Sequence, residues 1–168
     1  MIFTALSDGR FLLPQAETRC ALGRSGVIEA AAKREGDGFA PLGDWPIRRL
    51  LYRPDRGKPP TALEAQPIGP DDGWCDDPGD TAYNRPVCLP YPASAEVMWR
   101  DDGLYDLVVV LGHNDDPPVA RMGSAIFLHL AKPGYAPTEG CVALCRPDME
   151  TLLGQVRPGD VLRIARAE

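Results

Sequence analysis

Two segments in the last third of the chain have the clearest hydrophobic pattern. Tyr105–Gly112 is an apolar, largely β-branched run, and Ser124–Leu130 is a second apolar run. Continuous apolar runs of this length are typical of strands that are buried on both faces. The pattern therefore predicts two central strands.

The two ends of the chain show shorter patterns. Ile2–Leu6 and Arg10–Leu13 alternate loosely on either side of a Ser-Asp-Gly turn, which predicts a β-hairpin. Pro147–Leu153 begins with a proline and acidic residues, which suit a helix N-terminus. Val161–Ala165 follows a Pro-Gly turn and is predicted to be a closing strand.

The first half of the chain is less regular. Gly and charged residues dominate Arg19–Tyr52, which we interpret as turns that link short strands. Arg53–Pro92 is rich in Pro, Asp and Gly, so we expect a long surface excursion with little regular structure. Its aromatic residues Trp74, Tyr83 and Tyr91 indicate that this excursion is packed against the protein and is not a linker.

Length and charge narrow the class of protein. The 168 residues, 44% of them hydrophobic, predict one domain spanning 1–168. A net charge of −6 without a basic run disfavours nucleic-acid binding. The longest apolar run, Leu107–Leu111, is far too short for a membrane span, so we expect no membrane insertion. Met1–Asp8 shows no signal-peptide pattern, so we expect a mature chain, a truncated chain or another route of export.

Five cysteines are too few for a disulfide scaffold, and the odd number leaves at least one free thiol. Cys75 and Cys88 flank the Pro-rich excursion and are candidates for a pair in an oxidising compartment. We expect Cys145 to be a small core residue.

The sharpest chemical feature is Cys141, which lies twelve residues after His129 at the end of an apolar run. An imidazole can take the proton of a thiol and later return it to a leaving amine, so the two residues could act as nucleophile and base. Gly140 permits a tight turn that would aim the nearby amides at an oxyanion. The alternatives are a buried core cysteine with a structural histidine, or a zinc site that adds His113 and Cys145. No Cys-x-x-Cys or His-x-x-x-His pair supports the zinc site.

These residues resemble a known family. Gly123–His129 followed by Pro137–Leu144 resembles the catalytic signature of the YkuD-type L,D-transpeptidases, in their small single-domain branch. Further similar segments are Ala21–Gly26, Lys33–Gly38, Pro41–Gly43, Tyr83–Pro86 and Leu111–Asn114, so the resemblance covers nearly the whole chain.

The resemblance implies a mainly β fold, a sandwich or distorted barrel with a few short helices. It also implies a cysteine enzyme that acts on peptidoglycan stem peptides, with no metal and no organic cofactor. In such an enzyme a thiolate attacks a carbonyl of a donor stem, and the side-chain amine of a diaminopimelate on an acceptor stem resolves the acyl-enzyme into a crosslink.

By position in the motif, Cys141 would be the nucleophile and His129 the general base and then acid. The amides of Gly140 and Cys141 would form the oxyanion hole, and Thr138 stands where the motif has Ser or Thr. Glu139 replaces the usual His of the motif, and Ala143 stands where Arg or Asn is expected, so substrate contacts must differ.

Other residues are candidates for substrate contacts. His113 and Asn114 follow a buried strand, and Tyr135 lies in the loop between His129 and Cys141. Thr138 and Glu139 adjoin the nucleophile, and we consider Glu139 as a receptor for the ammonium group of the acceptor.

Three hypotheses of function remain open at this point. The first is a transpeptidase that makes either third-to-third crosslinks or first-to-third crosslinks from L-Ala to diaminopimelate. The second is an L,D-carboxypeptidase, in which water resolves the same acyl-enzyme. The third is a catalytically silent peptidoglycan-binding module. We expect a monomer in the periplasm or cell envelope, or alternatively a cytoplasmic protein that acts on recycled fragments.

Overall fold

The computed structural model describes residues 1–168, and most of its regular structure is β. The strands of the large sheet are β1 (Ile2–Leu6), β2 (Arg10–Leu13), β3 (Ala16–Arg19), β4 (Gly26–Glu29), β5 (Phe39–Tyr52), β6 (Ala65–Pro67), β10 (Leu107–Leu111), β11 (Phe127–Leu130), β12 (Val142–Leu144) and β13 (Val161–Ala165). A smaller sheet holds β7 (Asp72–Cys75), β8 (Pro86–Cys88) and β9 (Ala95–Val97). The helical elements are α1 (Arg146–Gln155) and the 3-10 turns η1 (Ala30–Ala32), η2 (Pro54–Arg56) and η3 (Pro133–Tyr135).

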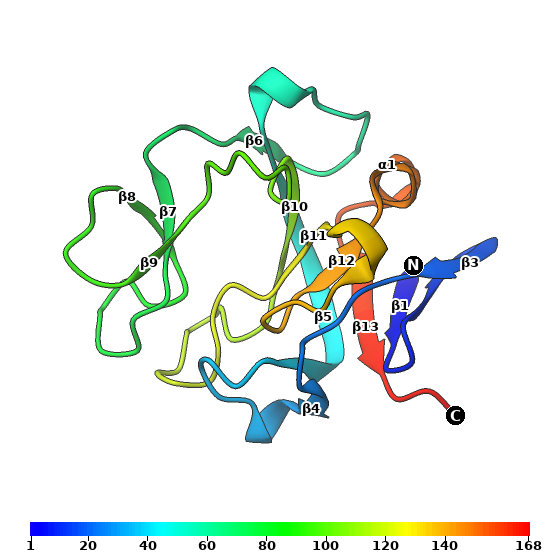
Figure 1. Ribbon diagram of the computed structural model, residues 1–168, viewed down its shortest axis with the longest axis horizontal. Coiled ribbons are helices and arrows are strands. Elements are labelled where there is room, and N and C mark those ends of the chain that lie inside the picture. Colours follow the sequence, from blue (N-terminus) through cyan, green and yellow to red (C-terminus); the bar gives the residue numbers. More distant parts are fainter.

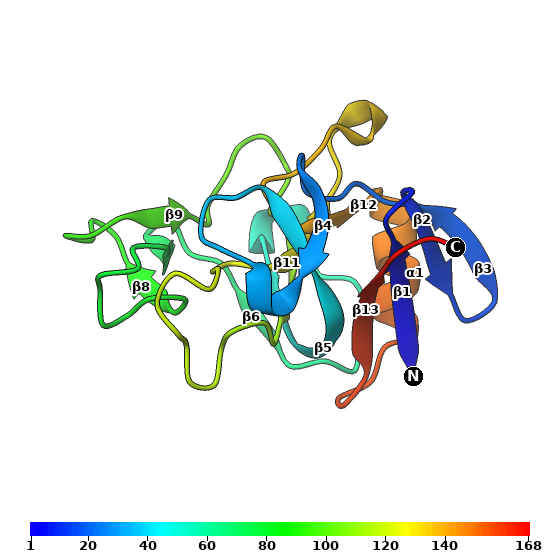
Figure 2. The same cartoon turned by 90° about the horizontal axis from the view of Figure 1, so that it is seen from below.

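The large sheet curls into a nearly closed barrel (Figure 1, Figure 2). Its strands follow the order β12-β11-β10-β5-β13-β1-β2-β3, and β4 and β6 also pair with β5. The segment after β3 returns to β12, where Ala21 and Ala143 exchange two backbone hydrogen bonds of 2.9 Å. This bridge joins the two ends of the sheet order, so the predicted mainly β fold of the distorted-barrel type is confirmed.

The core consists of two apolar clusters, and β10 contributes to both. All five residues of β10 are buried, and α1 contributes Met149, Leu152 and Leu153, each fully buried. The hairpin of β1 and β2, the strand β13 and the helix form where the sequence predicts them. The second apolar run forms a strand only from Phe127, because Ala125 has a positive φ of 52° that interrupts extended backbone. No helix is long and apolar enough to cross a membrane.

The expectation of short strands and turns across Arg19–Tyr52 is wrong, since this range contains β5, the longest strand, with 14 residues. The first half of β5 pairs with β4 and β13, and its second half pairs with β10 and β6. Pro, Gly and charged residues in β5 conceal the strand pattern, but partners from distant parts of the chain supply its ladder hydrogen bonds.

The Pro-rich excursion is ordered, as predicted, and forms the sheet β8-β7-β9 beside the barrel (Figure 1). Trp74 of β7 packs edge-on against Phe127 of β11 with ring centroids 5.0 Å apart, which fixes the small sheet to the barrel. Cys75 and Cys88 are both free thiols: Cys88 on β8 lies opposite Asp72 in the register, at the other end of β7 from Cys75.

Candidate active site

Two neighbouring parallel strands hold the candidate nucleophile and base. His129 lies in β11, and Cys141 directly precedes β12. The two strands pair in register from Leu128 with Val142 onward, so both side chains lie at the same part of the sheet. They line one cavity of about 420 Å³. The structure therefore brings together the pair that the sequence singled out.

The Cys141 thiol is well shielded, with the residue only 9% exposed. Its Sγ donates to the carbonyl oxygen of Ala125 at 3.2 Å and accepts the N–H of Phe127 at 3.4 Å. Burial, followed by the negative charge of Glu96, raises the pKa of this thiol to about 12. The thiol is consequently protonated at neutral pH when no substrate is bound.

The His129 imidazole is held in one orientation. Its Nδ1 lies 2.9 Å from the carbonyl oxygen of Leu130, which can only accept, so Nδ1 carries the proton and Nε2 keeps a free lone pair. The Tyr105 ring packs against it with centroids 5.4 Å apart. Burial lowers the pKa of His129 to about 4, so the ring is neutral and able to accept a proton.

Thr138 fixes the turn that presents Cys141. Its Oγ1 donates to the carbonyl oxygen of Cys141 at 2.7 Å and accepts the N–H of Gly140 at 3.1 Å. Gly140 has a φ of +139°, and a Cβ there would approach the carbonyl oxygen of Phe39 to 2.9 Å, so only glycine fits. Because the Gly140 N–H is engaged by Thr138, the Cys141 N–H is the better placed of the two predicted oxyanion donors.

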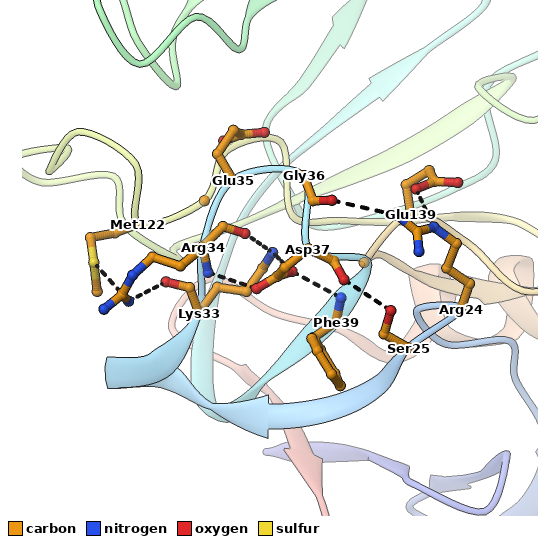
Figure 3. A network of polar contacts seen from close by, with 12 residues as sticks. Arg24, Ser25, Lys33, Arg34, Glu35, Gly36, Asp37, Phe39, Met122 and Glu139 are labelled. Atoms are coloured by element: carbon orange, nitrogen blue, oxygen red, sulfur yellow. Dashed lines mark hydrogen bonds and ion pairs between the residues drawn. The ribbon is translucent and has the colours of Figure 1, made fainter.

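Thr138 and Glu139 both line the cavity. Glu139 lies at its rim with a side chain that is 82% exposed, and Arg24 Nε donates to its Oε2 at 2.8 Å (Figure 3). The Glu139 carboxylate, which we considered for the acceptor ammonium, is therefore already paired with Arg24.

The other three predicted contacts lie outside the cavity lining. His113 is buried, with Nε2 3.0 Å from the carbonyl oxygen of Met122 and its ring edge-on to Trp45. The Asn114 side chain makes three hydrogen bonds within the loop that runs to residue 123. The Tyr135 ring lies under the Arg19 guanidinium, 5.0 Å from its Cζ. These contacts give all three residues roles in packing or loop structure.

A charged loop between η1 and β5 forms another wall of the cavity (Figure 3). Asp37 accepts hydrogen bonds from Lys33 Nζ at 2.5 Å, from the Arg34 N–H at 2.7 Å and from the Phe39 N–H at 2.9 Å. Burial alone would raise the pKa of Asp37, but these three donors lower it. The network holds the loop so that Glu35 points away from it and lines the cavity.

Sequence reasoning missed several residues of the cavity. Tyr105 and Arg100 precede β10, and Asp76 and Glu96 come from the small sheet. No local motif marks Asp76 or Glu96, because they reach the cavity only through the docking of the small sheet. A sequence signal existed only for Tyr105, as the first residue of an apolar run.

The structure offers no site for the zinc alternative. No group of three or more His, Cys, Asp or Glu side chains is arranged so that it could hold a metal ion. The cavity lining carries the Cys141 thiol, the His129 imidazole, four carboxylates and three cationic side chains.

The comparisons with known proteins show the family of the chain. The family model of the YkuD L,D-transpeptidase catalytic domain matches residues 3–164, almost the whole chain. A search of curated proteins finds no match. The chain belongs to the family of YkuD L,D-transpeptidase catalytic domains.

Proposed function

We propose that this protein is a peptidoglycan L,D-transpeptidase with Cys141 as nucleophile and His129 as its base. The observation that carries the proposal is that the buried thiol and a neutral imidazole line one cavity of about 420 Å³, within a chain of this family. A cavity of this size accommodates a segment of peptide.

The protonation states define the first step. With pKa values of about 12 for the thiol and about 4 for the imidazole, a resting thiolate is disfavoured. His129 Nε2 therefore takes the thiol proton as Sγ attacks the donor carbonyl carbon. The Cys141 N–H stabilises the oxyanion that forms. The C–N bond then breaks, and the leaving amine receives the proton from His129.

Resolution of the acyl-enzyme decides the product. An acceptor amine of a diaminopimelate residue attacks the thioester and forms a crosslink, whereas attack by water would shorten the stem. Because the substrate lies outside the inner membrane, we propose that the protein is located in the cell envelope. Cell fractionation tests this location.

The first experiment uses wild type and Cys141→Ala with disaccharide tripeptide, tetrapeptide and pentapeptide muropeptides. We expect crosslinked dimers from wild type alone, and tandem mass spectrometry of the dimers identifies the donor carbonyl as that of the first or third stem residue. Shortened monomers without dimers would assign a carboxypeptidase. The absence of both product and acyl-enzyme would contradict catalysis.

A further inference from the structure

Three carboxylates in the catalytic cavity have no cationic partner. Glu35, Asp76 and Glu96 all line the cavity, and none of them makes a salt bridge. The fourth lining carboxylate, Glu139, is paired with Arg24. The three unpaired groups form what we call the acidic wall.

Two separate parts of the fold build the acidic wall. Asp76 follows β7, and Glu96 lies in β9 opposite Trp74, so the small sheet supplies both. Glu35 comes from the charged loop held by Asp37 (Figure 3). Placing like charges together opposes folding, so a wall assembled from two docked elements points to a binding role.

The hydrogen bonds that the wall accepts within the protein come from neutral groups. Tyr83 and Tyr105 donate neutral hydroxyl groups to Glu35 and Glu96. Burial raises the pKa of Glu96; the hydrogen bond from Tyr105 and the charge of Arg100 lower it, and the charges of Asp76 and Glu35 raise it further. These two carboxylates are therefore close enough to Glu96 to repel its charge.

Two polar atoms beside the wall make no hydrogen bond of normal geometry. Asp76 Oδ1 is buried without a hydrogen bond. Ser124 is 8% exposed, lines the same cavity, and its Oγ also lacks a hydrogen bond. Buried polar atoms without partners cost free energy, so their presence at the wall indicates a ligand that donates hydrogen bonds.

Three cations also line the cavity: Arg100 and Lys33 are engaged in ion pairs, and Lys132 lies in the segment between β11 and β12, which is neither of the elements that build the wall. Arg100 donates to both carboxylate oxygens of Asp102, at 3.1 and 2.5 Å. Lys33 is buried and bound to Asp37. The wall is consequently the part of the cavity that would attract a positively charged group.

We infer that Glu96, Asp76 and Glu35 form the subsite for the ammonium group of the acceptor substrate. An ammonium has three N–H donors and no acceptor, which matches a wall of carboxylate oxygens with an unpaired hydroxyl beside it. This inference rests on the proposed function and replaces Glu139 as the receptor of that group.

The wall also accounts for the protons released when the acceptor amine attacks the acyl-enzyme. The bound ammonium loses one proton to a wall carboxylate, which passes it to solvent, and becomes a neutral amine. The amine nitrogen then bonds to the thioester carbonyl carbon, and the C–S bond breaks. The second proton moves from nitrogen through His129 Nε2 to the departing Cys141 Sγ.

Binding to Cys141→Ala tests the subsite without turnover. The probes are a stem tripeptide that ends in diaminopimelate and the same peptide with its side-chain amine acetylated, both measured by calorimetry. We expect the ammonium form to bind about tenfold more tightly, and Glu96→Gln or Asp76→Asn in the same background to remove that preference. The matched controls are Glu64→Gln and Asp71→Asn, at exposed residues outside the cavity. These variants should retain the preference for the ammonium form.

Kinetics of the active protein complete the test. In Glu96→Gln we expect an acceptor KM raised about tenfold and no slowing of donor acylation, because loss of the carboxylate charge lowers the pKa of the Cys141 thiol. An equal loss in acylation and transfer, or an unchanged KM with retained ammonium preference, would overturn the subsite. Asp76→Asn gives the same readouts if Glu96→Gln does not fold. A wild type that forms neither acyl-enzyme nor dimers would overturn the proposed function, and the subsite with it.

Discussion

At the scale of single residues, the resting site is a neutral thiol beside a neutral imidazole. Burial raises the pKa of Cys141 to about 12 and lowers that of His129 to about 4. Only the thiolate is nucleophilic, so the free enzyme should react slowly with simple alkylating agents. In the proposed reaction, a stem peptide that occupies the cavity brings the electrophile to the thiol, and proton transfer to His129 accompanies attack.

Alkylation by iodoacetamide tests this protonation state. Below its pKa, the thiolate fraction of Cys141 rises with pH, so we expect its alkylation rate to increase about tenfold per unit from pH 7 to 10 with no plateau. Peptide mapping by mass spectrometry measures each cysteine separately, and the exposed Cys88 should react first at pH 7. A rate for Cys141 that levels off near pH 6 to 7 would show a resting thiolate–imidazolium pair and contradict this expectation.

The Thr138 hydroxyl provides a second test at this scale. Thr138→Val keeps the shape of the side chain but removes both hydrogen bonds that fix the Cys141 turn. We expect acylation to slow by about tenfold or more, because each such bond contributes roughly 1 kcal/mol and the turn positions the nucleophile. Thr138→Ser retains the hydroxyl and should restore the rate. Equal rates in the valine and serine variants would exclude this positioning role.

At the scale of elements, the charged loop depends on one buried ion pair. The Lys33 side chain is 3% exposed and is neutralised by Asp37. In Asp37→Asn the lysine charge stays buried without its carboxylate, which should lower the free energy of unfolding by about 3 kcal/mol. Since the folded state lowers the pKa of Asp37, its contribution exists at neutral pH and is lost as the pH falls through that carboxyl group's titration.

Urea unfolding followed by tryptophan fluorescence measures this effect. The double variant Lys33→Met with Asp37→Asn removes both charges and should recover part of the stability, because no unpaired charge remains buried. If the single variant costs less than about 1 kcal/mol, the ion pair does not hold the loop in the way described.

The elements that the sequence predicts are those whose signal is local. The β1–β2 hairpin, α1 and β13 have their turn residues, caps or alternation within a few positions. The strand β5 escapes prediction because Pro46 and Gly43 lie within it, and its pairing depends on residues more than a hundred positions away, such as Val161 and Ile164. Such non-local pairing leaves no pattern in a short window.

The same distinction applies to the site. Cys141 and His129 could be predicted because they lie twelve residues apart on neighbouring strands with a recognisable motif. Glu96 and Asp76 could not, since they enter the cavity only after the small sheet has docked through Trp74 and Phe127. The buried position of His113 could not be predicted from sequence, because it follows from packing against Trp45.

At the scale of the whole molecule, the acidic wall implies a cost in stability. Burial, with a smaller contribution from two neighbouring carboxylates, raises the folded-state pKa of Glu96 above its usual 4.5, although the Tyr105 hydrogen bond and the Arg100 charge act in the opposite direction. The folded state therefore binds more protons than the unfolded state above pH 4.5, and the ionised carboxylate destabilises the protein at neutral pH. This cost disappears as the pH falls towards 4.5.

Neutralising that carboxylate should consequently stabilise the free protein. We expect Glu96→Gln to raise Tm at pH 7 by about 2 to 4 °C, corresponding to roughly 1 kcal/mol, and to give little gain at pH 4. The exposed control Glu64→Gln should leave Tm unchanged at both pH values. A lower Tm for Glu96→Gln at pH 7 would mean that the hydrogen bond from Tyr105 outweighs the repulsion, which contradicts a net cost of the charged wall.

With saturating stem tripeptide the difference in Tm between wild type and Glu96→Gln should shrink or reverse, because a ligand stabilises the protein in proportion to its affinity and the ammonium favours the charged wall. The same carboxylate would then lower stability in the free protein and supply binding energy in the complex.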